Sequence, residues 1–256
     1  MSEPKAQPQQ APRSLSNDLL WPAYLLYGVV NVAAFAVLAL LAVVAVLLLP
    51  RIGQRRAAAH WTARTYLVLG AMPLRIHGSE HLPAGQCVVV ANHASYLDGP
   101  IMKAALPPRF AFVVKREMDT VPLAGFLLRR IGSEFVERFN RHKGANDARR
   151  MLRSASGGQA FAFFPEGTFS QEIGLLKFHT GAFTTAVRAG CPVVPAVIRG
   201  SRANLPSDRW LPRWGAIDVE FLPPLTAAGD AENAAIELRD RTRAQILARL
   251  GEPDLS

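Results

Sequence analysis

Residues 87–99 read CVVVANHASYLDG, and they place a polar turn directly after a short apolar run. The run at 87–91 does not alternate between apolar and polar residues, which is typical of a central strand covered on both faces. Asn92 and His93 then follow at a strand-to-helix turn, and Asp98 lies five residues after His93. Because α/β proteins place their sites at the carboxyl ends of strands, this stretch predicts a buried strand that presents His93 and Asp98 at one sheet edge.

The pair His93 and Asp98 suits proton transfer. An imidazole takes a proton from a hydroxyl, while a nearby carboxylate fixes its tautomer and stabilises the imidazolium that forms. The simpler interpretation of the same stretch is a polar turn in which Asn92 and Asp98 cap a helix. Taken alone, the stretch leaves both interpretations open.

A second buried run ends in the same way at residues 161–170, which read FAFFPEGTFS. Pro165 and Gly167 stop the strand, so we expect Glu166 and the backbone amides of Gly167 and Thr168 to be exposed. Glycine lets a ligand approach the main chain closely. By itself, this segment is also compatible with an ordinary turn.

The rest of the chain alternates between short apolar runs and helical patterns, which predicts an α/β fold with a mixed, largely buried sheet flanked by helices. We predict strands at residues 86–91, 110–115, 134–137, 160–164, 192–199 and 217–222. We predict helices at residues 99–105, 122–130, 146–154, 178–189 and 232–249.

The N-terminal part of the chain predicts three segments. Residues 1–16 are polar and proline-rich, as in a disordered tail, and no charge occurs between Asp18 and Arg51. One membrane span needs roughly 20 apolar residues, so residues 17–72 predict a membrane anchor before a domain at 73–256. The anchor is either a transmembrane helix or a re-entrant pair broken near Gly28 and Asn31. A cleaved signal peptide would have a shorter apolar run of about 7–15 residues.

Charge gives the anchor an orientation. Five arginines and no acidic residue lie between the apolar run and Glu80, so the positive-inside rule places the following domain in the cytoplasm, at what we expect to be a bacterial inner membrane. Residues 57–72 form a possible second helix, which either lies in the membrane interface or packs on the domain. The residues that share its apolar face by helical spacing are Trp61, Thr65, Val68, Leu69 and Met72.

The formal charge of +9 suits nucleic acid, an anionic membrane or an anionic substrate. We do not expect nucleic acid, because no binding motif accompanies the charge. The basic stretch 141–153 is either a solvated helix face or a contact for acidic lipid, coenzyme A or acyl carrier protein. Cys87 and Cys191 belong to no C-x-x-C pair, and His77 and His81 lie near turn residues without a third ligand, so we expect neither a metal nor a bound cofactor.

Taken together and in this order, the two runs resemble the glycerolipid acyltransferase family typified by lysophosphatidic acid (1-acylglycerol-3-phosphate) acyltransferase. The family's N-H-x-S-x-x-D block matches residues 92–98, and its F-P-E-G-T-R-S block matches 164–170 except at one position. Weaker blocks match at 132–138, which ends in Arg138, at 114–118, which contains Lys115, and at 193–198. The resemblance covers roughly residues 73–225.

The resemblance implies a membrane-associated O-acyltransferase that moves an acyl group from acyl-CoA or acyl carrier protein to the hydroxyl of a lysolipid. His93 would be the general base and Asp98 would orient it. The implied contacts to the acceptor come from Arg138, Lys115, Glu166, Gly167 and Thr168.

One residue departs from the family pattern. Phe169 replaces the arginine of the second block, and that arginine is thought to help hold the acceptor phosphate. We therefore expect 1-acylglycerol-3-phosphate or a related lysolipid, with a lyso-aminolipid as the alternative. A non-catalytic lipid-binding scaffold and a thioester hydrolase are the remaining alternatives.

Overall fold

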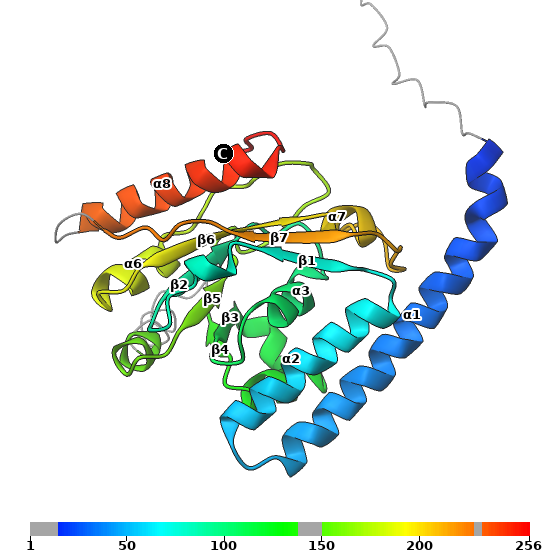
Figure 1. The fold of residues 1–256 in the computed structure, drawn as a ribbon, viewed down its shortest axis with the longest axis horizontal. Helices are drawn as coiled ribbons and strands as arrows, with labels where there is room; N and C mark the ends of the chain where they lie inside the picture. Colours follow the sequence, from blue (N-terminus) through cyan, green and yellow to red (C-terminus); the bar gives the residue numbers. More distant parts are fainter. Residues whose placement is uncertain (1–14, 138–149, 228–231) are drawn as a thin grey trace, which may run out of the picture.

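A seven-stranded sheet forms the centre of the molecule in the computed structural model, which describes residues 15–137, 150–227 and 232–256 (Figure 1). The strand order is β1-β7-β6-β2-β5-β3-β4, and every neighbouring pair is parallel except β6 and β7. The predicted mixed sheet is thus confirmed. The strands are β1 (Leu74–His77), β2 (Val88–Ala91), β3 (Ala111–Lys115), β4 (Glu134–Val136), β5 (Phe161–Phe163), β6 (Val193–Arg199) and β7 (Ile217–Phe221).

Helices cover both faces of the sheet, with α8 on one side and α2 on the other (Figure 1). The α-helices are α1 (Leu15–Leu48), α2 (Ile52–Leu69), α3 (Asp98–Ala105), α4 (Ala124–Arg130), α6 (Gly181–Arg188), α7 (Ser201–Asn204) and α8 (Glu232–Leu250). Two short 3-10 helices, η1 (Ser79–His81) and η2 (Arg116–Thr120), complete the described elements.

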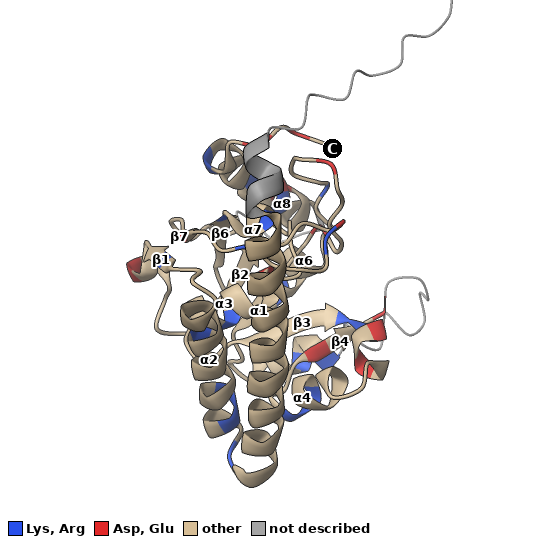
Figure 2. Ribbon diagram, turned by 90° about the vertical axis from the view of Figure 1, so that its right-hand side faces the viewer, with Lys and Arg blue, Asp and Glu red and all other residues tan. Residues whose placement is uncertain are grey.

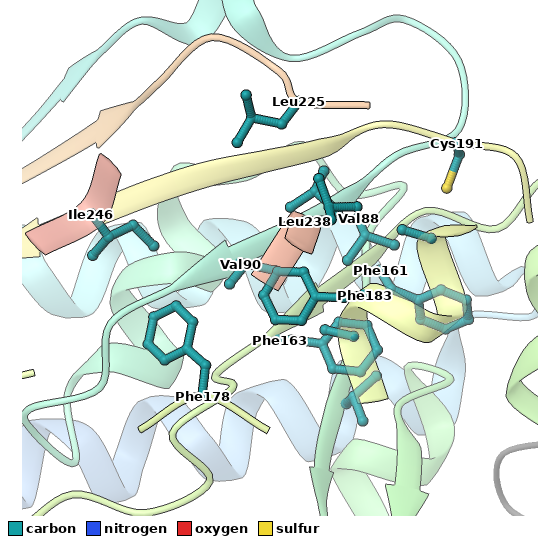
Figure 3. Packing of buried hydrophobic residues seen from close by; sticks show 14 of the residues in the cluster. Val88, Val90, Phe161, Phe163, Phe178, Phe183, Cys191, Leu225, Leu238 and Ile246 are labelled. Carbon is teal, nitrogen blue, oxygen red and sulfur yellow. The ribbon is translucent and has the colours of Figure 1, made fainter. Parts of the chain in front are cut away.

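Strand β2 shows why the central run is apolar throughout. Val88 and Val90 belong to a cluster that includes side chains of α6 and α8 (Figure 3). Val89 and Ala91 point to the opposite face and join a cluster with α2 and α3. Successive strand residues face opposite sides, so a strand covered on both sides needs an apolar residue at every position.

Helix α1 is continuous through Gly28 and Asn31, so the alternative with a break at these residues does not describe the structure. It turns back at Pro50 into α2, and the two helices are joined by polar side chains. Tyr66 Oη donates a 2.7 Å hydrogen bond to Asn31 Oδ1, which is buried. Among the described residues, one helix is long and apolar enough to cross a membrane. This helix is α1, and its apolar segment is Trp21–Leu48.

Helix α2 packs on the domain mainly through residues outside its predicted apolar face. Tyr66 and Leu67 are buried, whereas Trp61, Val68 and Leu69 are exposed. The helical spacing indicates which residues share an apolar stripe. It does not show whether that stripe packs on the domain or lies in the membrane interface. The structure leaves most of that stripe uncovered, beside the exposed side chains of α1.

Most predicted elements are present with shifted ends. Strand β1 was missed, because four residues with alternating burial carry little signal until the distant β7 pairs with them. Helix α6 starts three residues later than predicted, since His179 N–H donates to Pro165 O and holds the preceding segment against the turn after β5. Of the predicted helix at 146–154, residues 146–149 lie outside the described part, and 150–156 are helical.

Candidate active site

The candidate site lies at the ends of two neighbouring strands, β2 and β5, whose following connections cross the sheet in opposite directions. From β2 the chain passes through α3 to β3, and from β5 it passes through α6 to β6, on the other side of β2. Strands β2 and β5 are parallel neighbours, so their carboxyl ends open side by side. Such a switch point is where open α/β sheets bind their ligands. The sheet therefore brings the turn after β2 and the turn after β5 together.

His93 and Asp98 form a hydrogen-bonded pair in this crevice. His93 Nδ1 lies 2.9 Å from Asp98 Oδ2, and the Asp98 side chain is fully buried. The same oxygen accepts the backbone N–H groups of Ala94 and Ser95 at 2.6 and 2.8 Å. Since this oxygen is an acceptor, the proton of neutral His93 belongs on Nδ1. That tautomer leaves the Nε2 lone pair available to accept a proton.

Two neighbouring side chains fix the turn that carries His93. Asn92 makes two hydrogen bonds to the backbone of Ile198 on β6, at 2.7 and 3.0 Å. Ser95 Oγ donates to Leu205 O at 2.6 Å and accepts the Leu97 N–H. Asn92 thus anchors the turn to the sheet instead of capping a helix, and Ser95 anchors it to the segment after α7.

Glu166 joins the two turns. Its Oε1 accepts the backbone N–H of His93 at 2.6 Å, and its Oε2 accepts the N–H of Leu176 at 2.9 Å. The prediction that Glu166 is exposed was wrong: the residue is only 4% exposed, because its carboxylate turns inward to the two backbone amides. Burial raises the pKa of the Glu166 carboxyl to about 7. Both oxygens are therefore engaged with the backbone, which makes Glu166 a residue that positions His93.

An aromatic wall surrounds the His93 ring. Phe164 stacks on it at 4.5 Å between ring centroids, and Phe169 meets it edge-on at the same separation. Tyr96, which is largely exposed, contacts Phe169 in turn. Phe169 therefore lies at the mouth of the crevice, against the base itself. The sequence gives no local signal for these ring contacts, because the three aromatic residues come from two separate blocks.

The other predicted acceptor-binding residues follow the same sheet edge. Lys115 ends β3, the strand next to β5, and is partly buried. Gly167 has a left-handed φ of 74° and donates its N–H to Phe164 O, so this amide is already used. Thr168 is exposed beside it. Arg138 lies outside the described residues, two positions after the end of β4.

Arg202 is a residue of this region that the sequence did not indicate. It follows β6 on α7 and pairs with Glu252 at 3.1 Å. Its guanidinium also donates to the carbonyl groups of Ser170 and Glu172. It thereby holds the loop after the second block in place. Its position after a central strand, at the same sheet edge as His93, is the signal that could have found it.

An apolar cavity of about 210 Å³ lies beside this crevice. Val113, Val136 and Met151 line it together with Phe163, Phe164 and Gly167. It is thus continuous with the turn after β5 that carries Glu166. Its walls suit a hydrocarbon chain.

The spaced histidines His77 and His81 and the two cysteines have structural contacts. His77 lies 3.6 Å from Asp218, and His81 Nδ1 lies 2.8 Å from Phe221 O. Cys87 and Cys191 are free and buried, and burial raises the pKa of the Cys191 thiol to about 11. Within the described residues, no group of three His, Cys, Asp or Glu side chains is arranged to hold a metal ion.

Comparison with known proteins agrees with this geometry. A family described as "Acyltransferase" matches residues 73–199, which include β2, β5 and both turns. The chain belongs to the acyltransferase family. The acyltransferase is 27% identical over 237 residues to 1-acyl-sn-glycerol-3-phosphate acyltransferase of Saccharomyces cerevisiae, covering 90% of this chain and 78% of that protein.

The names of other relatives do not all give the same acceptor. The acyltransferase is 26% identical to 1-acyl-sn-glycerol-3-phosphate acyltransferase of Haemophilus influenzae, over 77% of this chain and 81% of that one. It is 31% identical to lyso-ornithine lipid O-acyltransferase of Pseudomonas aeruginosa, over 60% of this chain and 57% of that one. In fold it matches the crystal structure of the lysophosphatidic acid acyltransferase PlsC from Thermotoga maritima, with a TM-score of 0.70, 21% identity and coverage of 87% and 96% of the two chains.

Proposed function

We propose that this acyltransferase moves a fatty acyl group from an acyl thioester to the free hydroxyl of a membrane lysolipid, with His93 as general base. The observation that carries the proposal is the hydrogen bond from His93 to the buried carboxylate of Asp98, at the switch point of the sheet. A scaffold that only binds lipid has no need of an oriented imidazole with one free nitrogen. The donor is acyl-CoA or acyl carrier protein.

The chemical steps use few protein groups. Nε2 of His93 removes the proton of the acceptor hydroxyl, and the oxygen attacks the thioester carbonyl carbon. The C–S bond breaks as the new C–O ester bond is completed. The leaving thiolate takes the proton back from the imidazolium, whose charge the Asp98 carboxylate stabilises in the meantime. No acyl-enzyme is required.

The acceptor extends along the sheet edge from His93. Strands β2, β5, β3 and β4 are successive neighbours, about 4.8 Å apart. The span from His93 to Lys115 is therefore about 10 Å. We propose that Lys115 and Arg138 hold an anionic part of the acceptor, with Gly167 and Thr168 forming the floor between His93 and Lys115. The cavity of about 210 Å³ receives an acyl chain.

For Arg138, the proposal predicts a specific kinetic change. Loss of one charge-assisted hydrogen bond costs about 1.5–3 kcal/mol, which corresponds to roughly a tenfold to 150-fold change in affinity. Arg138→Ala should therefore raise the acceptor KM by about that factor. An unchanged acceptor KM and kcat in a folded variant would remove Arg138 from the site.

We propose 1-acylglycerol-3-phosphate as the first acceptor to test, with a lyso-aminolipid as the second candidate. Phe169 favours the second candidate, because it replaces an arginine and lies against His93 and Tyr96. The lyso-ornithine lipid relative has the same reaction on an aminolipid in its name. An ammonium group next to aromatic rings gains a cation–π interaction, worth about 0.5–2 kcal/mol.

The test is product analysis with purified full-length protein, a panel of lysolipids and both donors. A new ester seen by mass spectrometry supports the proposal, free fatty acid alone would indicate a thioester hydrolase, and neither product would indicate a scaffold. Phe169→Arg should then shift the ratio of kcat/KM values toward the phosphate acceptor, whereas Phe169→Leu should lower activity with aminolipid without that shift. Equal preference in all three proteins would exclude Phe169 from head-group selection.

The packing of α1 supports a particular mode of membrane association. The domain contacts this helix from Tyr24, which stacks on Trp214, to Val46, whose carbonyl accepts a hydrogen bond from Arg130. These residues are about 33 Å apart along the helix axis, similar to the roughly 30 Å hydrocarbon core. A perpendicular span would therefore carry Arg130 and the domain into hydrocarbon, at high cost. We propose that α1 and the exposed stripe of α2 insert into one leaflet, with the domain on the cytoplasmic side.

A further inference from the structure

A groove of about 320 Å³ lies between the start of α1 and the loop 208–213, apart from the crevice of His93. Trp21, Tyr24 and Leu25 of α1 form one wall, and the loop forms the other. Trp21 is 62% exposed and Trp210 is 86% exposed, which is unusual for such large side chains. Tryptophan with one side apolar and one side wet is typical of the membrane–water interface.

The charge of the groove is positive. Arg209 and Arg213 line it with a single acidic residue, Asp208. Neither arginine forms an ion pair with a carboxylate in the described part of the chain. The Arg213 guanidinium lies 4.6 Å from the Tyr24 ring centroid, and stacking of this kind leaves the N–H groups at its edge free to donate. Two guanidinium groups and one carboxylate give a formal charge that one phosphodiester balances.

The groove is held rigidly between the anchor and the active site. Trp214 stacks on Tyr24 at 4.5 Å, and Gly28 allows close contact with Leu211, because a Cβ at Gly28 would lie 2.7 Å from Leu211 Cβ. At its other end, the loop continues from Leu205, whose carbonyl accepts the hydrogen bond of Ser95 in the catalytic turn. The groove thus joins helix α1 to the turn that carries His93.

We propose that this groove binds the head group of one anionic phospholipid of the surrounding bilayer, with its phosphodiester between Arg209 and Arg213. Trp21 and Trp210 flank the glycerol region, and Leu25 on the exposed side of α1 meets the acyl chains. The bound lipid fixes the depth and tilt of the catalytic crevice relative to the membrane surface. The phosphodiester is the recognised group, so phosphatidylglycerol binds and phosphatidylcholine, whose choline cancels the charge, binds more weakly.

The test is lipid binding to detergent-solubilised full-length protein, without any acyl donor. Dihexanoylphosphatidylglycerol is added below its micellar concentration, and the one-to-one complex is measured by native mass spectrometry. Arg209→Gln combined with Arg213→Gln should weaken binding by roughly tenfold to 150-fold for each charge-assisted hydrogen bond that the substitutions remove. Arg188→Gln combined with Arg241→Gln, on α6 and α8, changes the net charge equally and should leave binding unchanged.

The proposal would be overturned by the lack of a one-to-one complex with the wild-type protein, by equal affinity for dihexanoylphosphatidylcholine, or by equal losses in the two double variants. Binding that survives Arg209→Gln with Arg213→Gln would place the lipid in another site, such as the acceptor crevice. Competition by free sn-glycerol 3-phosphate at similar affinity would indicate a site for a soluble phosphate ester. None of these readouts needs turnover, so the proposed acyl transfer stands or fails separately.

Discussion

At the scale of single residues, the proposed mechanism depends on His93 and Asp98 acting as one unit. Asp98 Oδ2 accepts hydrogen bonds from three donors, namely His93 Nδ1 and the amides of Ala94 and Ser95. The carboxylate therefore fixes both the ring and the backbone beneath it. Removing either partner removes the same function, because the imidazole without its carboxylate is neither oriented nor stabilised as a cation.

The His93 and Asp98 variants should show this coupling. General-base catalysis contributes about 10²–10⁴-fold, so His93→Ala and Asp98→Asn should each lower kcat/KM by at least about that factor. The double variant should be no worse than His93→Ala, because the effects of residues acting as a unit do not add. The measurement is kcat/KM of folded protein in detergent. A His93→Ala enzyme with more than about a tenth of wild-type activity contradicts the base assignment.

The raised pKa of Glu166 predicts that the free energy of unfolding depends on pH. Burial raises its pKa to about 7 from the ordinary value of 4.5, so between these pH values the folded protein holds a proton that the unfolded chain has lost. The unfolding free energy from this group therefore falls as pH rises from 4.5 to 7, by about 3 kcal/mol at most.

Glu166→Gln removes that titration, since glutamine has no proton to lose in this range. The difference in melting temperature, wild type minus Glu166→Gln, should decrease between pH 5 and pH 7 and become constant above it. The measurement is thermal unfolding of both proteins in one detergent over this pH range. A difference that is independent of pH would mean that Glu166 is ionised throughout.

At the scale of elements, the contact between α1 and α2 depends on one polar side chain. Asn31 is 3% exposed and accepts a hydrogen bond from Tyr66 Oη, while its Nδ2 donates to Tyr27 Oη. A polar group in an otherwise apolar helix fixes the register of the pair, because any other register leaves it unsatisfied.

Asn31→Ala should therefore destabilise the helix pair. It leaves the buried hydroxyl of Tyr66 without this acceptor, at a cost of about 1–3 kcal/mol. Val30→Ala is the matched control, because Val30 is its neighbour on the same helix and is exposed. Thermal unfolding in detergent should show a lower melting temperature for Asn31→Ala alone. Equal effects of the two substitutions would mean that the hydrogen bonds add nothing to the packing.

At the scale of the whole molecule, one face combines the exposed side of α1 with the groove between α1 and the loop 208–213. Figure 2 shows α1 running across this face without charged residues along most of its length. A surface of this size and composition requires a nonpolar partner. The single-leaflet insertion proposed above would set this surface against the hydrocarbon.

Membrane fractionation checks this arrangement. The protein should sediment with membranes and resist high salt and carbonate, and a C-terminal reporter should be active in the cytoplasm. Insertion into one leaflet predicts that an N-terminal tag lies on the same side, whereas a complete span places it on the opposite side. Recovery of full-length protein in the soluble fraction would refute the anchor, and termini on opposite sides would refute the single-leaflet arrangement.

The sequence by itself determined the central strands, the two polar turns and the pairing of His93 with Asp98. Local rules suffice there, because a strand buried on both faces must be apolar throughout and because His93 and Asp98 are close in the chain. It also identified the apolar helix, since length and lack of charge are properties of the segment alone. Glu166 was singled out for the same reason, but as a contact to the acceptor; its hydrogen bonds to the backbone of His93 and Leu176 were not predicted.

Only the tertiary structure decided which groups meet across long stretches of chain. Strand β1 forms only because it pairs with β7. The role of Asn92 depends on its hydrogen bonds to the backbone of Ile198. The role of Arg202 depends on its hydrogen bonds to the loop after β5. Packing also decides which side of α2 is buried: Tyr66 and Leu67 are buried, whereas most of the predicted apolar face stays exposed. Such contacts are set by the packing of distant elements, and no local pattern carries them.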